Sequence, residues 1–100
     1  MITAMERLKL YESVVNTYGI KSQQYMLVEE CGELLNALAK LIRGRASFEE
    51  LNTELADVSI MVEQIAHFYG WEEFLEERGR KLERLKQRLE EHHKKENGSN

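Results

Sequence analysis

The sequence is poor in the residues that interrupt or cross-link small folds. It contains no proline, six glycines and one cysteine among its 100 residues. Strand-rich folds need more turn residues than this, so we expect helices. A lone cysteine excludes an internal disulfide and a cysteine-based zinc site. No apolar run approaches the roughly 18 residues that span a bilayer, and the first residues lack the basic-then-apolar order of a signal peptide. We therefore expect a cytoplasmic chain with no membrane partner.

Charge is unevenly distributed along the chain. The totals are 14 basic and 18 acidic side chains, a formal net charge of −4, which argues against nucleic acid as a partner. Residues 1–77 hold 6 basic and 14 acidic side chains, whereas residues 78–100 hold 8 basic and 4 acidic ones. The sequence therefore predicts an acidic body followed by a basic C-terminal segment.

Three glycines divide the chain into helix-compatible stretches. Gly19, Gly44 and Gly70 each follow such a stretch, at the position where a glycine often ends a helix. The predicted helices cover residues 2–18, 22–43, 47–69 and 71–94, and Ser47 and Glu50 form a capping box at the start of the third. The short connections predict an all-α, four-helix antiparallel bundle-like domain over residues 1–96. Residues 97–100 are expected to be a disordered tail.

The second and third predicted helices each carry an apolar stripe. The members recur at alternating spacings of four and three residues: Leu27, Cys31, Leu34, Leu38 and Leu41, then Leu51, Leu55, Val58, Val62 and Ile65. Such stripes usually form a packed core, so Cys31 is expected to be a small buried residue and not a nucleophile. Stripes on most helices of so short a chain also predict a homo-oligomer, either a homodimer or a homotetramer.

Four acidic residues lie beside these stripes at matched positions. A shift of 24 residues along the chain places Glu30 on Glu54 and Glu33 on Asp57. Acids three residues apart on a helix repel each other, so two such pairs brought together destabilise the fold unless a cation lies between them. Carboxylate ligands without cysteine or paired histidine suit Mg²⁺, with Mn²⁺ as an alternative. The competing interpretation is four solvated acids on amphipathic helices.

The same acids form a recognisable motif. Glu29, Glu30 and Glu33, followed by Glu54 and Asp57, resemble the EExxE…ExxD signature of the MazG-like all-α nucleotide pyrophosphohydrolases, and the likeness extends over residues 24–88. The resemblance implies a Mg²⁺-dependent enzyme that cleaves a nucleoside triphosphate, (d)NTP, to (d)NMP and pyrophosphate. It also implies that Glu30, Glu33, Glu54 and Asp57 are the metal ligands and the catalytic residues. Glu29 faces away from the stripe. We expect it to support the metal ligands without binding the metal itself, or to lie at a contact between subunits.

A polyanionic substrate also needs cations from the protein. Lys81 and Arg84 lie in a stretch that resembles the basic segment of the family, which implies that they bind substrate phosphates. Gln24 resembles a glutamine of some small members and is a further candidate for binding the nucleotide. Gly79 and Gln64 depart from the family pattern, because several relatives carry asparagine at these places.

A second function from a different class stays open on the sequence. The chain has the stripes of a non-catalytic helical oligomerisation or interaction module. The function of such a module does not require four carboxylates beside two stripes in matched register. The acidic quartet is therefore the feature that separates the two hypotheses.

Overall fold

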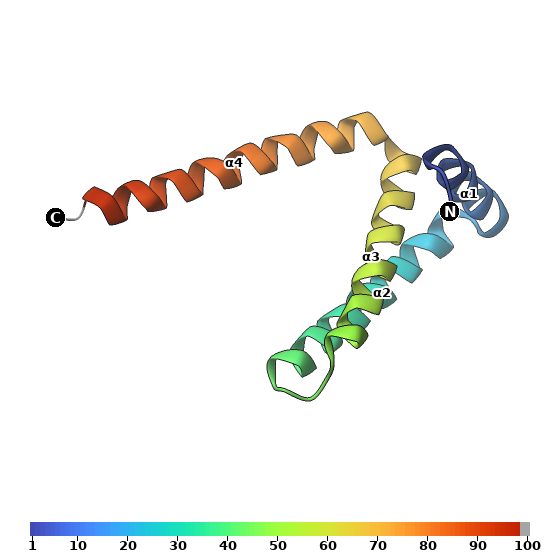
Figure 1. Ribbon diagram of the computed structural model, residues 1–100. Coiled ribbons are helices and arrows are strands. Elements are labelled where there is room, and N and C mark those ends of the chain that lie inside the picture. The colour runs from blue at the N-terminus through green and yellow to red at the C-terminus, as the bar shows by residue number, and fades with distance from the viewer. Residues whose placement is uncertain (99–100) are drawn as a thin grey trace. The chain divides into compact units, whose positions relative to one another are not determined.

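A computed structural model describes residues 1–98 as four α-helices, with no strand among them (Figure 1). The helices are α1 (Ala4–Tyr18), α2 (Ile20–Ile42), α3 (Phe48–Tyr69) and α4 (Trp71–Gly98). The predicted all-α class and the number of helices are confirmed. The chain divides into two compact units, one comprising α1–α3 and ending at Tyr69, the other beginning at Gly70 and containing α4. None of the helices in residues 1–98 is long and apolar enough to cross a membrane.

The helix boundaries follow from local capping chemistry. Thr3 and Glu6 form a capping box at the start of α1, in which each side chain accepts from the other residue's backbone N–H. At the start of α3 the Glu50 N–H donates to Ser47 Oγ at 3.2 Å, which is one of the two bonds of the predicted capping box. Gly19 has a φ of +87° and ends α1 directly against α2. Helix α2 consequently begins two residues earlier than predicted, at Ile20.

Helix α4 is longer than its sequence pattern indicated. It continues to Gly98, so that residues 97 and 98 of the expected tail are helical. The remainder of that expected tail, residues 99–100, lies outside the described residues. The extension adds polar turns to a helix whose apolar residues end at Leu89.

Helices α2 and α3 form the structural centre of the first unit. A five-residue connection, 43–47, joins them, and they pack against each other in opposite directions (Figure 1). Helix α1 contacts both of them. The hydroxyl of Tyr11 on α1 donates to Glu63 Oε1 of α3 at 3.2 Å, and Arg7 Nε lies 2.9 Å from the same oxygen.

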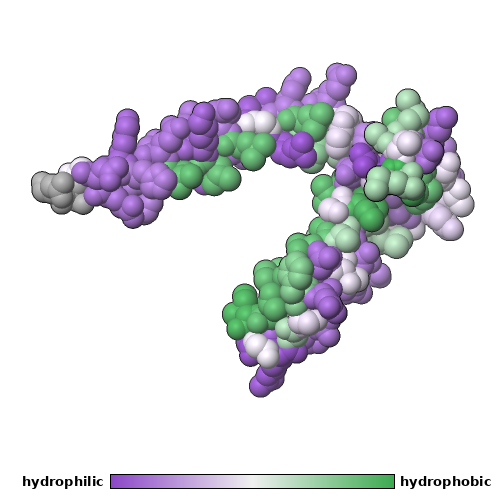
Figure 2. Space-filling model, viewed as in Figure 1, coloured by the Kyte–Doolittle hydropathy of each residue, from purple (hydrophilic) through white to green (hydrophobic). Residues whose placement is uncertain are grey.

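The two apolar stripes are only partly covered. Of their members, Leu51 is buried, whereas Leu38 and Leu55 keep 40% and 44% of their surface exposed. Cys31 is exposed, so its prediction as a buried core residue is wrong. The spacing places Cys31 on one stripe, but the packing of α2 against α3 leaves this part of the stripe exposed. Figure 2 accordingly shows apolar side chains at the surface of this unit.

The buried centre of the first unit contains a polar pair. Gln23 of α2 and Gln64 of α3 retain 3% and 4% exposure, and Gln64 Nε2 donates to Gln23 Oε1 at 2.7 Å. Among the residues that the structure describes, the buried apolar side chains are Tyr11, Leu51 and Met61. The amide pair therefore specifies how α2 meets α3, because any other register separates the two buried amides.

We expect the amide pair to be sensitive to single substitutions and tolerant of a double one. Gln64→Leu leaves the Gln23 carbonyl buried without a donor, which should lower the free energy of unfolding by about 1–3 kcal/mol. The double variant Gln23→Leu/Gln64→Leu removes both partners and should regain most of that loss. Urea unfolding of the three proteins measures both effects. Equal losses that simply add in the double variant would contradict a mutual hydrogen bond.

Candidate metal centre

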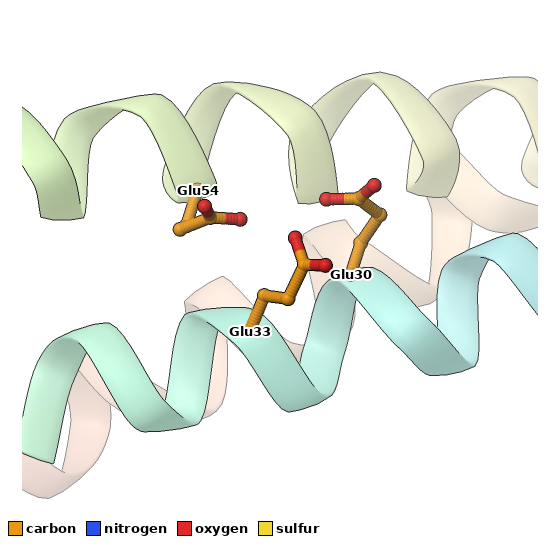
Figure 3. Close-up of side chains that lie close together, drawn as sticks. All are labelled: Glu30, Glu33 and Glu54. Atoms are coloured by element: carbon orange, nitrogen blue, oxygen red, sulfur yellow. The ribbon is translucent and has the colours of Figure 1, made fainter.

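Three carboxylates converge between α2 and α3 (Figure 3). Glu30 and Glu33 are one helical turn apart on α2, and Glu54 reaches toward them from α3. One oxygen from each lies within 4.8 Å of the others. Because α2 and α3 are packed against each other, the three side chains are held by helix backbone and not by loops.

The cluster contains acceptors that nothing in the protein satisfies. Glu30 Oε2 and Glu54 Oε2 are both buried without a hydrogen-bond partner. Within the described part of the chain, the ion pairs found all involve other acids: Glu63, Glu77 and Glu96. Buried carboxylate oxygens without donors are costly. A bound cation would remove this cost, because it would interact with both buried oxygens.

The electrostatics of the cluster also favour a cation. Burial raises the pKa of Glu30 above its ordinary value, and the carboxylates of Glu33, Asp57 and Glu54 raise it further. Burial likewise raises the pKa of Glu54, with Glu33 and then Asp57 as the charged neighbours responsible. Both shifts mean that the ionised forms are disfavoured in the metal-free protein. A divalent ion reverses this preference because it attracts the ionised form.

Asp57 lies at the margin of the cluster. It acts on the pKa of both Glu30 and Glu54, and it is half-buried on α3 one turn after Glu54. Its carboxylate is nevertheless outside the three that share the 4.8 Å separation. The structure therefore brings together three of the four predicted ligands and places the fourth beside them.

Glu29 stands apart from these residues. It is exposed on α2 and does not belong to the carboxylate cluster. This separation follows from helical geometry, because Glu29 directly precedes Glu30 and successive residues point about 100° apart around the helix.

The predicted substrate-binding residues occupy both units. Gln24 lies on α2, and its Nε2 donates to the Tyr69 hydroxyl at the end of α3. Lys81 and Arg84 are exposed on α4, in the second unit. Lys81 Nζ lies 4.0 Å from Glu77 Oε1, an exposed pair that leaves the ammonium free to take another anion.

The structure also contains a cavity that no sequence pattern indicated. It has a volume of about 300 Å³ and lies between α1 and α3, where Tyr11, Asn16, Gln64, His67 and Phe68 are among its lining residues. The Tyr11 and His67 rings have centroids 5.8 Å apart. These residues come from distant segments, so only the packing of α1 on α3 brings them together.

Comparison with known proteins adds no relative to this description. No family model, no curated protein and no solved structure matches the chain. The carboxylate geometry, and the motif to which those carboxylates belong, are therefore the features of the chain that point to a function.

Proposed function

We propose that the chain is a Mg²⁺-dependent nucleoside triphosphate pyrophosphohydrolase of the MazG-like type, acting in the cytoplasm. The observation that carries the proposal is the cluster of Glu30, Glu33 and Glu54, whose oxygens approach within 4.8 Å. Two of those carboxylates bury an oxygen without a donor. An accidental surface cluster would instead turn its oxygens toward water, so the arrangement favours a hard divalent cation.

The residues present fit such an ion. Glu30, Glu33 and Glu54 would hold it, and Asp57 is placed to join them; Mn²⁺ suits the same oxygens. When bound, the metal supplies charge neutralisation for the phosphates and activation of a water molecule. The side chains of the cluster are catalytic residues in this proposal because they fix that chemistry in place.

The protein's own cations complete the proposal. Lys81 and Arg84 are exposed, carry positive charge and lie in the basic segment of the chain, so they are suited to bind phosphate oxygens. Gln24 presents an amide that can contact the nucleotide, and Glu29 stands beside Glu30 in the sequence. The reaction hydrolyses the bond between the α- and β-phosphates and releases pyrophosphate.

Self-association is part of the same proposal. Large apolar side chains with more than 60% of their surface exposed occur on both α2 and α3, among them Val28, Leu35 and Phe48. A soluble chain rarely leaves so many apolar side chains facing water. We infer a homodimer or homotetramer, in which other subunits cover these side chains.

A substrate panel tests the activity directly. The full chain is incubated with Mg²⁺ and each common NTP and dNTP, and released pyrophosphate and nucleoside monophosphate are quantified. We expect both products in equal amounts from at least one nucleotide, and none after chelation with EDTA. Release of orthophosphate in place of pyrophosphate would contradict the proposed bond cleavage.

The panel also decides between the two functional classes. The exposed apolar residues alone are equally compatible with a non-catalytic oligomerisation module. Such a module releases no pyrophosphate from any nucleotide. It also shows no Mg²⁺ binding that depends on Glu54.

A further inference from the structure

The buried Gln23–Gln64 pair lies in line with the carboxylate cluster along the contact between α2 and α3. Because these helices pack in opposite directions, a step toward the C-terminus from Gln23 matches a step toward the N-terminus from Gln64. Seven residues along each helix in these senses, or about two turns, the matching positions hold Glu30 and Asp57. The amides and the acids therefore share one register, and a slip that separates the first pair also displaces the second.

The next matching positions are acidic as well. Three residues further along the two helices stand Glu33 and Glu54, which belong to the cluster whose oxygens lie within 4.8 Å of one another (Figure 3). Each of the two acid pairs also contains a buried oxygen without a hydrogen-bond partner, Glu30 Oε2 or Glu54 Oε2. Like charges at this distance repel each other. In the metal-free protein, this part of the contact therefore favours a slip or a separation of the two helices.

The amide pair opposes that displacement. Gln64 Nε2 donates to Gln23 Oε1 at 2.7 Å, and Gln23 Nε2 in turn donates to Met26 Sδ at 3.7 Å, which fixes the orientation of the Gln23 amide. Both glutamines are buried, so a slip would leave their polar atoms without water or a partner. The hydrogen bond from Gln24 to Tyr69 also joins α2 to α3, but it is exposed and water can replace it. A buried polar contact selects one register of two helices, which apolar side chains alone do not.

We propose that Gln23 and Gln64 are positioning residues of the carboxylate cluster, whose buried hydrogen bond holds the facing acids together before a cation binds. The consequence for metal binding rests on the proposed function, whereas the register belongs to the metal-free chain. The apparent metal affinity falls with the fraction of chains that hold the competent arrangement. The pair therefore controls the affinity although it lies about two helical turns from the nearest carboxylates.

Titration of the full chain with Mn²⁺, in which the free ion is quantified by EPR, tests the effect on metal binding. Gln23→Leu/Gln64→Leu should keep most of the stability, because it removes both amides, but should raise the Kd for Mn²⁺ at least about fivefold. Tyr11→Phe is the matched control: it removes the hydrogen bond from α1 to Glu63 and leaves the contact between α2 and α3 intact. Its Kd should equal that of the wild type, and urea unfolding measures the stability of each protein.

The outcomes separate this role from the metal centre itself. A double variant that binds Mn²⁺ as tightly as the wild type would overturn the positioning role and leave the metal centre standing, provided that Glu54→Gln still weakens binding. Equal weakening in the double variant and in Tyr11→Phe would also overturn it, because general stability would then set the affinity. A wild type that binds no Mn²⁺ would refute the metal centre, and with it the role of the amides in metal binding.

A distance measurement tests the register without any metal. In a Cys31→Ser background, Lys21→Cys and Glu49→Cys place spin labels at exposed positions near opposite ends of the α2–α3 pair. Labelled chains are diluted with unlabelled ones, and pulsed EPR is recorded in EDTA. Replacing both amides by leucine should shift or broaden the distance distribution by up to about one helical pitch, roughly 5.4 Å. Identical distributions with and without the amides would refute the proposal.

Discussion

The proposed release of pyrophosphate should be at least about 100-fold slower in Glu54→Gln, since a metal ion held by the cluster would stabilise the charge of the transition state by several kcal/mol. The substitution keeps the size and the hydrogen-bonding shape of the side chain but removes its negative charge. Glu54 is the one member of the three-carboxylate cluster that α3 supplies. Without its charge, both remaining carboxylates of the cluster belong to α2.

The mechanism of this loss can be separated from unfolding. Because the pKa of Glu54 is raised by burial and by Glu33 and Asp57, replacing it with a neutral amide removes repulsion from the metal-free protein. We therefore expect Glu54→Gln to be as stable as the wild type or more stable without Mg²⁺, while losing activity. A structural role alone would instead lower stability and activity together.

Glu49→Gln is the matched control for this experiment. Glu49 is an exposed acid in the first turn of the same helix and lies outside the carboxylate cluster. Its replacement changes the net charge by the same amount as Glu54→Gln. Rates of pyrophosphate release, measured across a range of Mg²⁺ concentrations, should match the wild type for this variant. Equal losses in both variants would show that net charge, and not the cluster, controls the rate.

The register of the candidate site was accessible from the sequence. The 24-residue shift that superposes the two acid pairs also superposes the two apolar stripes, so antiparallel packing of the stripes puts both acid pairs on the same side of the contact. The structure does this for Glu30, Glu33 and Glu54. The shift could not predict how far each carboxylate reaches into the space between the helices. The sequence therefore did not indicate that Asp57 lies at the margin of the cluster.

Other features depend on contacts between distant segments. The Gln23–Gln64 pair requires α2 and α3 to meet, and the cavity beside Tyr11 requires α1 and α3 to meet. No local pattern encodes either contact. The exposure of Cys31 has the opposite origin. Its stripe position was predicted correctly, but a stripe reports that a residue needs a partner and not that its own chain provides one.

A second large effect concerns stability in Mg²⁺. If the cluster binds the ion only in the folded state, Mg²⁺ at about 100 times its Kd should add about 2.7 kcal/mol to the free energy of unfolding. For a chain of this length, that gain corresponds to a rise in Tm of roughly 10 °C or more. Differential scanning calorimetry near pH 7.5 measures it. Glu30→Gln and Glu54→Gln should lose most of the rise, and Glu49→Gln should keep it.

The pH dependence of the stability of the metal-free protein tests the carboxylate cluster independently of Mg²⁺. Because the pKa values of Glu30 and Glu54 are raised in the folded state, the folded protein binds protons more tightly than the unfolded chain does. Their contribution to stability is complete below the ordinary carboxyl pKa of 4.5, and it is lost as the pH rises through the raised values. In EDTA, the Tm of the wild type should therefore fall, relative to that of Glu30→Gln/Glu54→Gln, as the pH rises from 4.5 toward neutrality.

Mg²⁺ should cancel this fall at neutral pH and lose its effect in acid. Protons and the metal compete for the same oxygens, so the stabilisation by Mg²⁺ grows as the pH rises through the window in which the metal-free protein weakens. The two opposite slopes must both disappear in the double glutamine variant, because they arise from the same carboxylates. A stabilisation by Mg²⁺ that is equal at pH 5 and pH 7.5, or that survives in the double variant, would place the ion elsewhere on the chain. The carboxylate cluster would then be a repulsive feature of the fold without a metal to explain it.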